Sequence, residues 1–456
     1  MFSILSIKTR LASIKNGLGG RTKAVVYGSG LMALGTLIST ITRVVLIGIL
    51  ARIYTKDQFG MWVAITSATA VMATSDFGLG SSLKNKLAEL RAKGNAADDE
   101  AREYFLSVFY FFLVVATVIS LSLIFFRNQI PYGEMFKTAD RSLKIEGRNI
   151  LIAVQIIFLY GIPLSIGCPM FFAYGESKYV AFQSICIGIL SLVVIAALAF
   201  FHSSVTVTAI TFFLISILVN TTGTIHFLIK RKWNILDVKA KFIWIKVKSL
   251  LILSLTFAAF QIAGAFIYNA TTLIATANLS LANGAEINLV QKLYTFLITI
   301  YLSFYNPIWA GFAEAINEKQ WEWCRKALTR IIQFTSLVFI SGALCFTFFG
   351  NFFLQTLAGK GYVSNQYLFL SMGLWALFYS LYSMGSAFLS ALGKVKLITF
   401  STGVFALIYI SLGNWSSKVY GINGISIVSC SIFFILAVVT FWQAFFLLKK
   451  RIAAQA

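Results

Sequence analysis

The amino-acid sequence predicts an all-α membrane protein with about twelve transmembrane helices. Three observations lead to this prediction: 58% of the 456 residues are hydrophobic, only 12% are charged, and the mean hydropathy is +0.82. A soluble domain has about 25% charged residues, so this chain lacks the side chains that a water-facing surface requires. Most of its surface must therefore face lipid.

Each predicted helix is an apolar run long enough to span a bilayer. About 20 apolar residues cross the roughly 30 Å of hydrocarbon. Three of the four prolines, Pro163, Pro169 and Pro307, fall inside or near the ends of such runs, where we expect kinks. The twelve runs are 24–50, 58–80, 104–126, 149–173, 180–201, 205–229, 249–277, 285–309, 329–349, 366–392, 397–414 and 421–447.

The distribution of Lys and Arg predicts the orientation. With the amino terminus in the cytoplasm, 26 of the 38 basic residues lie in cytoplasmic segments and nine lie in external ones. Short basic loops remain on the cytoplasmic side, so both termini are predicted to be cytoplasmic. The external loop 127–148, with five basic residues, is the exception to this pattern.

The same pattern predicts five segments. In residues 1–23 the basic residues follow a short apolar start, the reverse of a signal peptide, so we interpret this segment as an uncleaved cytoplasmic arm. A first lobe (24–229), a basic cytoplasmic linker (230–248), a second lobe (249–447) and a cytoplasmic tail (448–456) follow.

Several function classes are excluded by the sequence. The net charge of +22 does not indicate nucleic-acid binding, because the basic residues lie between apolar runs. The five cysteines and two histidines lack metal-ligand spacing, and no P-loop is present, so neither a metal nor another cofactor is predicted. No predicted external loop exceeds about 22 residues, which argues against an enzyme with an external catalytic domain.

Polar residues recur at helical spacing in spans 1, 2, 7 and 8. These are the first two helices of each six-helix half, so the sequence predicts two six-helix lobes related by a pseudo-twofold axis along the membrane normal. The stripes are Ser29, Thr36, Thr40 and Arg43; Trp62, Thr66, Thr69 and Asp76; Ser254, Gln261, Tyr268 and Thr272; and Lys292, Thr295, Thr299, Ser303 and Asn306.

Arg43 and Lys292 are the central candidates, because a charged residue near the bilayer centre costs about 2.5–3.5 kcal/mol. Both are predicted about 10 Å below the outer surface, in a shared cationic cavity. Helix packing is the alternative role for the hydroxyls, and snorkelling or a structural ion pair is the alternative for the cations. Asp76 and Glu286, near the water interfaces, are candidates for ion coupling or gating. The predicted substrate-binding residues are Arg43, Lys292, Thr36, Thr40, Gln261, Asn269, Thr295, Thr299 and Asn306.

Four short segments resemble polysaccharide flippases. The resemblance lies in residues 51–62 (ARIYTKDQFGMW), 76–88 (DFGLG, then LKNKLA), 306–315 (NPIWAGFAEA) and 386–394 (SAFLSALGK). They are similar to segments of the O-antigen flippases, often called Wzx, of the multidrug/oligosaccharidyl-lipid/polysaccharide exporter superfamily. The resemblance implies a V-shaped bundle of two lobes that turns an undecaprenyl-pyrophosphate-linked sugar repeat unit from the cytoplasmic to the periplasmic leaflet. It also implies a role in lipopolysaccharide assembly beside other polysaccharide-assembly membrane proteins.

Other functions remain open at this point. A multidrug or cation-coupled exporter of the same superfamily typically uses acidic residues, whereas the first span here carries an arginine. A flippase for the peptidoglycan precursor is close in kind but commonly has two further helices. An O-antigen polymerase or membrane glycosyltransferase requires a substantial external loop. Energy coupling by protons, by sodium or by neither is compatible with the sequence.

Overall fold

The computed structural model confirms that the chain is all-helical where it is described. It describes residues 20–72, 78–94, 97–130, 136, 140–234, 240–302, 308, 311–312, 314–316 and 318–455, and the regular secondary structure of these residues is helical throughout. Eight of the described helices are long and apolar enough to cross a membrane. The chain is therefore a multi-pass membrane protein.

The helices form two groups. The first half consists of α2 (Gly20–Ile53), α3 (Lys56–Met72), α4 (Leu79–Ala92), α5 (Asp98–Phe125), α6 (Arg141–Ser165), α7 (Gly167–Ala173), α8 (Ser177–Phe200) and α9 (Val205–Arg231). The second half consists of α10 (Ala240–Asn278), α11 (Leu281–Leu302), α13 (Trp321–Ala358), α14 (Gln366–Ala391) and α15 (Lys396–Ala453).

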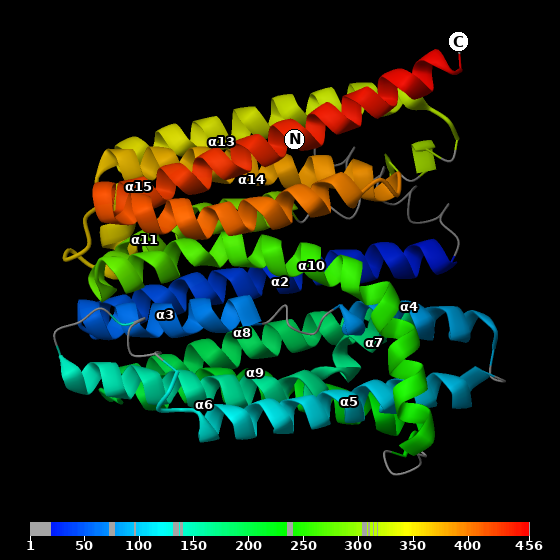
Figure 1. Cartoon of the computed structure of the whole chain (residues 1–456), viewed down its shortest axis with the longest axis horizontal. Coiled ribbons are helices and arrows are strands. Elements are labelled where there is room, and N and C mark those ends of the chain that lie inside the picture. Colours follow the sequence, from blue (N-terminus) through cyan, green and yellow to red (C-terminus); the bar gives the residue numbers. More distant parts are fainter. Residues whose placement is uncertain are drawn as a thin grey trace, which may run out of the picture.

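Packing follows this division only in part, because α3 packs more extensively on α10 and α11 than on the helices of the first half. In the first half, α2 packs on α8, α6 on α5 and α9, and α8 on α9. In the second half, α14 packs between α13 and α15, while α10 packs on α15 and α11. The halves meet where α3 contacts α10 and α11, α5 contacts α10, and α2 contacts α13. Figure 1 shows the roughly parallel helices, with α2, α3, α10 and α11 between the outer helices of each half.

Side-chain caps begin several helices. The Asp140 carboxylate accepts a hydrogen bond of 2.8 Å from the Ser142 amide at the start of α6, and Ser204 Oγ accepts one of 3.3 Å from Val207 at the start of α9. Asn365 Oδ1 accepts one of 2.7 Å from Leu368 in α14. These caps satisfy amide groups that the first helical turn leaves without partners.

The fourth predicted span, 149–173, is divided into two helices. Helix α6 ends at Ser165 and α7 begins at Gly167. Because Pro169 has no backbone N–H, it cannot bond the carbonyl of Ser165, and the helix breaks there. The side chain of Thr224 on α9 accepts a 3.1 Å hydrogen bond from the Gly167 amide and so satisfies the new helix start.

The second predicted span also differs from expectation, and the connection between the last two spans is shorter than predicted. Span 58–80 is not one helix: α3 ends at Met72, and α4 begins after Gly78, whose φ of 68° favours glycine. Spans 397–414 and 421–447 are two arms of α15, separated by non-helical backbone at Gly421. Tyr409 and Ser429, one on each arm, are joined by a 2.7 Å hydrogen bond, so the arms lie side by side.

The two connections with many basic residues are shorter than predicted. Helix α6 already begins at Arg141, inside the expected loop 127–148. Helix α9 continues to Arg231 and α10 begins at Ala240, so much of the expected linker 230–248 is helical. In Figure 1 the first part of α10 lies across α4, α5 and α7 before the helix turns toward the second half.

The outer surface of the bundle is strongly apolar. Phe125, Phe200, Phe348 and Phe400 are each at least 70% exposed and lie on four different helices. Exposed apolar surface of this extent is costly in water and matches a lipid-facing bundle.

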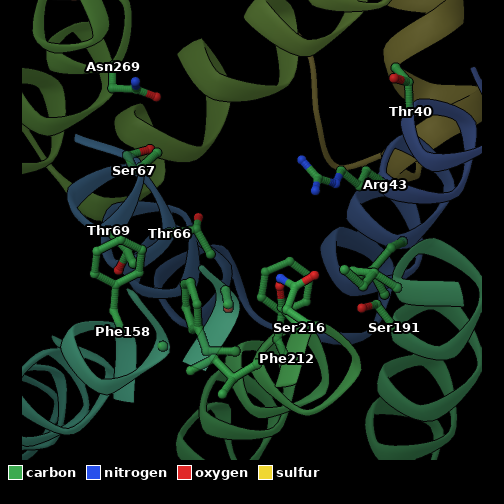
Figure 2. A pocket seen from close by; sticks show the side chains of 18 of the residues that line it. Thr40, Arg43, Thr66, Ser67, Thr69, Phe158, Ser191, Phe212, Ser216 and Asn269 are labelled. Atoms are coloured by element: carbon green, nitrogen blue, oxygen red, sulfur yellow. The ribbon is translucent and has the colours of Figure 1, made fainter. Parts of the chain in front are cut away.

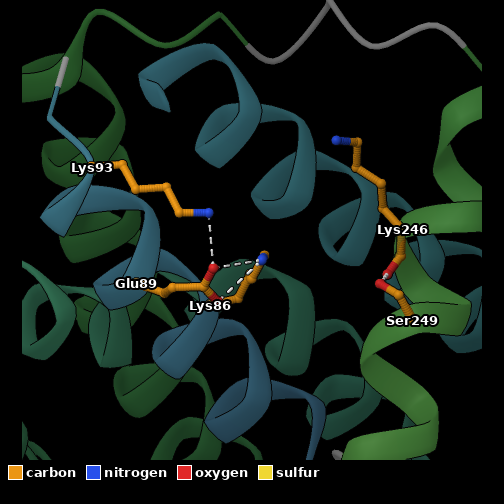
Figure 3. Close-up of polar contacts among 5 residues, drawn as sticks. All are labelled: Lys86, Glu89, Lys93, Lys246 and Ser249. Atoms are coloured by element: carbon orange, nitrogen blue, oxygen red, sulfur yellow. Dashed lines mark hydrogen bonds and ion pairs between the residues drawn. The ribbon is translucent and has the colours of Figure 1, made fainter. Parts of the chain in front are cut away.

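The end of the bundle that holds Lys86, Lys93 and Lys246 is called the basic end below. Glu89 lies between Lys86 and Lys93, at 3.1 and 3.0 Å, while Lys246 extends from α10 nearby (Figure 3). Hydrogen bonds from Lys93 and then Lys86 hold the pKa of the Glu89 carboxyl below its usual value. Lys246 also pairs with Glu103 of α5 at 2.9 Å, which joins the two halves at this end.

The halves also meet at the opposite end of the bundle. The Arg52 guanidinium, at the end of α2, donates hydrogen bonds to the carbonyls of Leu357 (3.1 Å) and Thr356 in α13. Lys56 lies 5.6 Å from the centre of the Tyr362 ring. The two halves are therefore in contact at both ends of the bundle, with a space between these contacts.

Candidate functional site

A cavity of about 610 Å³ lies inside the bundle. Its walls come from helices α2–α9 of the first half and from α10 and α11 of the second. Figure 2 shows Arg43 extending from α2 into this space, with Thr66 and Ser67 of α3 across from it and Phe212 and Ser216 of α9 below. The volume is that of a pocket for a ligand of drug-like size.

Arg43 and Lys292 are the charged residues among the described lining, and no carboxylate accompanies them there. Their positive charges lie within electrostatic range of each other. Arg43 is exposed to the cavity although it lies within the bundle, and Lys292 is half-buried. Because two like charges in a protein interior repel each other, an anion bound between them would be strongly favoured.

Counted along the helices, the two cations lie farther from the helix ends than from the predicted span ends. Arg43 is ten residues before the end of α2, and Lys292 is eleven residues after the start of α11. At 1.5 Å per residue both lie about 15 Å from the helix ends, instead of about 10 Å. The difference arises because α2 continues to Ile53 and α11 already begins at Leu281.

Several hydroxyl groups line the cavity, and their donors are satisfied by hydrogen bonds within their own helices. Thr40, Thr295 and Thr299 each donate a 2.8 Å hydrogen bond to the carbonyl four residues earlier in their own helix. Thr66 and Thr69 do the same on α3. The donor of each hydroxyl is therefore used, and its oxygen lone pairs remain to accept hydrogen bonds from a ligand.

Six of the nine predicted substrate-binding residues line the cavity: Arg43, Lys292, Thr40, Asn269, Thr295 and Thr299. Thr36 is exposed one turn before Thr40 and does not belong to the lining. Asn306 and the side chain of Gln261 lie outside the described residues, as does Asp76.

Two residues of the predicted stripe in the seventh span face the second half instead of the cavity. The Tyr268 ring packs 5.3 Å from that of Trp375, and its hydroxyl shares a 2.8 Å hydrogen bond with Thr295. Thr272 accepts a 3.3 Å hydrogen bond from Asn288. Both side chains therefore connect helices of the second half, which is the helix-packing role.

Glu286 lies away from the cavity, toward the opposite end of the bundle. It is half-buried on α11, beside Lys56 of the first half and Ser364 of the loop that follows α13. This region also holds the Lys56–Tyr362 contact. Glu286 therefore belongs to the contacts between the halves, whereas the cavity wall is formed by other residues.

The sequence did not indicate several polar lining residues. Ser165, Ser191, Ser216 and Asn220 come from α6, α8 and α9, and Asn288 comes from α11. Ser216, Asn220 and Thr224 are spaced four residues apart on one face of α9, which was a usable signal. Across the part of the chain that the structure describes, no three His, Cys, Asp or Glu residues gather as metal ligands.

No protein-family model and no curated protein sequence matches this chain. Among solved structures, it is similar to an inward-facing multidrug resistance MATE family transporter of the MOP superfamily. The TM-score is 0.72 at 13% identity, over 92% of this chain and 96% of that chain. The outward-facing conformation of such a transporter has a TM-score of 0.62 at 15% identity, over 95% of this chain and 97% of that one.

The lipid II flippase MurJ, in an inward closed conformation, is equally similar. Its TM-score is 0.72 at 15% identity, over 91% of this chain and 87% of that chain. The chain thus has the fold shared by MATE transporters of the MOP superfamily and by MurJ.

Proposed function

We propose that this protein translocates a lipid-linked saccharide with an anionic headgroup across the membrane by alternating access. The substrate class is an undecaprenyl-pyrophosphate-linked O-antigen or polysaccharide repeat unit, moved from the cytoplasmic to the periplasmic leaflet of a bacterial inner membrane. The observation that carries the proposal is the cavity in which Arg43 and Lys292 are the charged lining residues and no carboxylate accompanies them among those described.

The chemistry of the cavity fits such a headgroup. A pyrophosphate is an anion, and Arg43 and Lys292 provide opposite charge and hydrogen-bond donors. Thr40, Thr66 and Thr69 offer acceptor oxygens to sugar hydroxyls. At about 610 Å³ the cavity has room for a headgroup of drug-like size and not for a long polyprenyl chain, which stays in the lipid.

The architecture that we propose is twelve spans in two six-helix lobes, 24–229 and 249–447, related by a pseudo-twofold axis along the membrane normal. The basic end would face the cytoplasm, because short basic segments remain on that side. The arm 1–23, the linker 230–248 and the tail 448–456 would be cytoplasmic as well. Helices α10 and α11 form the part of the cavity wall that belongs to the second lobe.

Gating would occur at the two ends of the bundle. The Lys246–Glu103 pair closes the basic end, and the contacts of Arg52 and Lys56 close the opposite end. Glu286 lies among the latter contacts, so we propose a gating role for it. Alternating access requires that one set breaks while the other forms.

A vesicle assay tests the function. The purified chain is reconstituted with a fluorescent polyprenyl-pyrophosphate-linked saccharide, and flipping is measured as loss of protection from a membrane-impermeant quencher. The double variant Arg43→Gln, Lys292→Gln is expected to lower the rate at least tenfold, because each charge-assisted contact contributes about 1.5–3 kcal/mol. The matched control is Arg330→Gln, Lys418→Gln, which replaces exposed residues of the same types. Equal rates in the two double variants would exclude the cationic cavity as the substrate site.

A cation exporter is the alternative from a related class. Its binding site requires carboxylates, and the described cavity lining has none. Cells that carry the chain are expected to accumulate cationic dyes at the same rate as cells without it. Loss of the chain is expected to leave single lipid-linked units on the cytoplasmic side, whereas loss of a polymerase would leave single units at the cell surface.

A further inference from the structure

We infer that the first half alone holds the saccharide of the substrate, and that α9 selects it through Ser216 and Asn220. The second half would contact only the phosphate groups, through Lys292. This inference rests on the proposed function and assigns the parts of the substrate to different parts of the cavity. It follows from a difference between the interiors of the two halves.

The interior of the first half is hollow. All but five of the described lining residues belong to α2–α9 or to the break between α6 and α7. The five from the second half are Asn269, Asn288, Lys292, Thr295 and Thr299, and they form a single wall from α10 and α11. The cavity therefore extends from this wall into the first half, past Phe158 and Phe212, as far as Asn220.

The interior of the second half is filled by aromatic rings. The ring of Tyr379 lies 5.3 Å from that of Tyr268 and 5.2 Å from that of Phe433. Trp375 is completely buried beside them, 5.9 Å from Tyr379. Among the described residues, these closely packed rings leave little space for a ligand in the second half, so the halves are not equivalent as binding sites although each contains a bundle of helices.

Many polar groups of the second half form hydrogen bonds with one another. Thr271 shares hydrogen bonds with Tyr409 (2.8 Å) and Ser429 (3.1 Å), and Tyr382 shares one of 2.8 Å with Thr402. The Asn288 amide donates to Thr272 at 3.3 Å. Because these donors already have partners, the second half offers few groups to a sugar.

The first half presents polar groups beside aromatic surfaces, which is the composition of a site for a small polar ligand. Ser216 and Phe212 lie one turn apart on α9 and both face the cavity (Figure 2). The Asn220 side-chain oxygen has a long contact of 3.6 Å with the Cys168 thiol. Within the described residues, Ser191 Oγ and Trp62 Nε1 lack a hydrogen-bond partner.

The break between α6 and α7 holds this part of α9 in position. The Cys168 thiol donates to the backbone carbonyl of Asn220 at 3.2 Å, and the Gly167 amide donates to Thr224 at 3.1 Å. A Cβ atom at Gly167 would lie 2.7 Å from the Cα of Thr224, so the two backbones are in close contact. A rigidly held Asn220 can discriminate between hydroxyl arrangements better than a mobile one.

Two lipids in the vesicle assay test the inference. One is a polyprenyl pyrophosphate that carries a saccharide, and the other is the same polyprenyl pyrophosphate without sugar. The variants are Ser216→Phe, which fills the cavity, and Asn220→Leu, which removes the amide at similar volume. The matched controls are Leu218→Phe and Thr222→Leu, on the exposed face of the same helix. A variant that still flips the sugarless lipid is correctly folded.

We expect Ser216→Phe and Asn220→Leu to slow the saccharide lipid about tenfold or more and the sugarless lipid less than about twofold, since an unpaired buried polar contact costs a factor of this size. Trp375→Ala, in the second half, is expected to leave the ratio of the two rates unchanged. An equal decrease for both lipids in the α9 variants, or a changed ratio in Trp375→Ala, would overturn the inference and leave the proposed function intact. A wild-type chain that flips neither lipid would overturn the proposed function itself.

Discussion

A close approach of the two halves at Gly60 gives a quantitative prediction. A Cβ atom at Gly60 of α3 would lie 2.1 Å from the carbonyl oxygen of Leu281 at the start of α11, whereas ordinary contact begins at 3.4 Å. The substitution Gly60→Ala therefore forces α3 and α11 apart by about 1 Å, with a cost of about 1–3 kcal/mol as for overpacking. The cost applies only while the two helices are in contact. The equilibrium between conformations closed and open at the opposite end of the bundle should therefore shift about 5- to 150-fold toward the open ones.

Thiol labelling measures this shift. In a chain whose five native cysteines are replaced by serine, Thr40→Cys introduces a thiol into the cavity wall. A membrane-impermeant maleimide, added from the side that the opposite end faces, is expected to label it faster in Gly60→Ala than in the parent. Gly403→Ala is the matched control, because it is also helical but has nothing within 4 Å of the new Cβ. Both changes carry the same gain in helix propensity, about 1 kcal/mol. Equal labelling rates in the two variants would refute the steric argument.

Three further predictions concern stability, measured as thermal unfolding of the purified chain in detergent. Lys292→Met is expected to raise the melting temperature while it slows flipping, because a central lysine costs about 2.5–3.5 kcal/mol and Arg43 repels it. The control Lys418→Met replaces an exposed lysine and should change neither quantity. A lower melting temperature in Lys292→Met would show that the lysine stabilises the fold. Gly421→Ala is expected to destabilise the folded chain by about 1–2 kcal/mol because the φ of Gly421 is 62°, although no atom lies within 4 Å of the new Cβ. The control Gly403→Ala, in the same helix, should not destabilise the chain. Equal melting temperatures of the two variants would exclude backbone conformation as the cause. Trp233→Phe removes the 3.0 Å hydrogen bond to Asp98 while it keeps an aromatic ring against Phe105, so we expect a loss of about 1.5–3 kcal/mol in stability. Asp98→Asn keeps a hydrogen-bond acceptor and should lose less stability. An unchanged melting temperature in Trp233→Phe would mean that the hydrogen bond does not stabilise the fold.

The sequence by itself determined the class of the protein. The scarcity of charged residues and the lengths of the apolar runs depend only on composition and order, so the helical membrane class needs no knowledge of packing. Arg43 and Lys292 were identifiable for a similar reason. A charge within an apolar run is costly in whichever direction its helix turns, so it needs a polar environment or a partner.

Only the tertiary structure decided which helix faces surround the cavity. The sequence did not single out Ser216 and Asn220, and it placed Tyr268 in a polar stripe, yet Ser216 and Asn220 face the cavity and Tyr268 packs on Trp375. The direction in which a polar side chain faces depends on the rotation of its helix and on the volumes of the side chains across from it. The extension of α2 to Ile53 and the start of α11 at Leu281 likewise depend on contacts with other helices. Such contacts join residues that are far apart in the sequence, and a local pattern does not contain them.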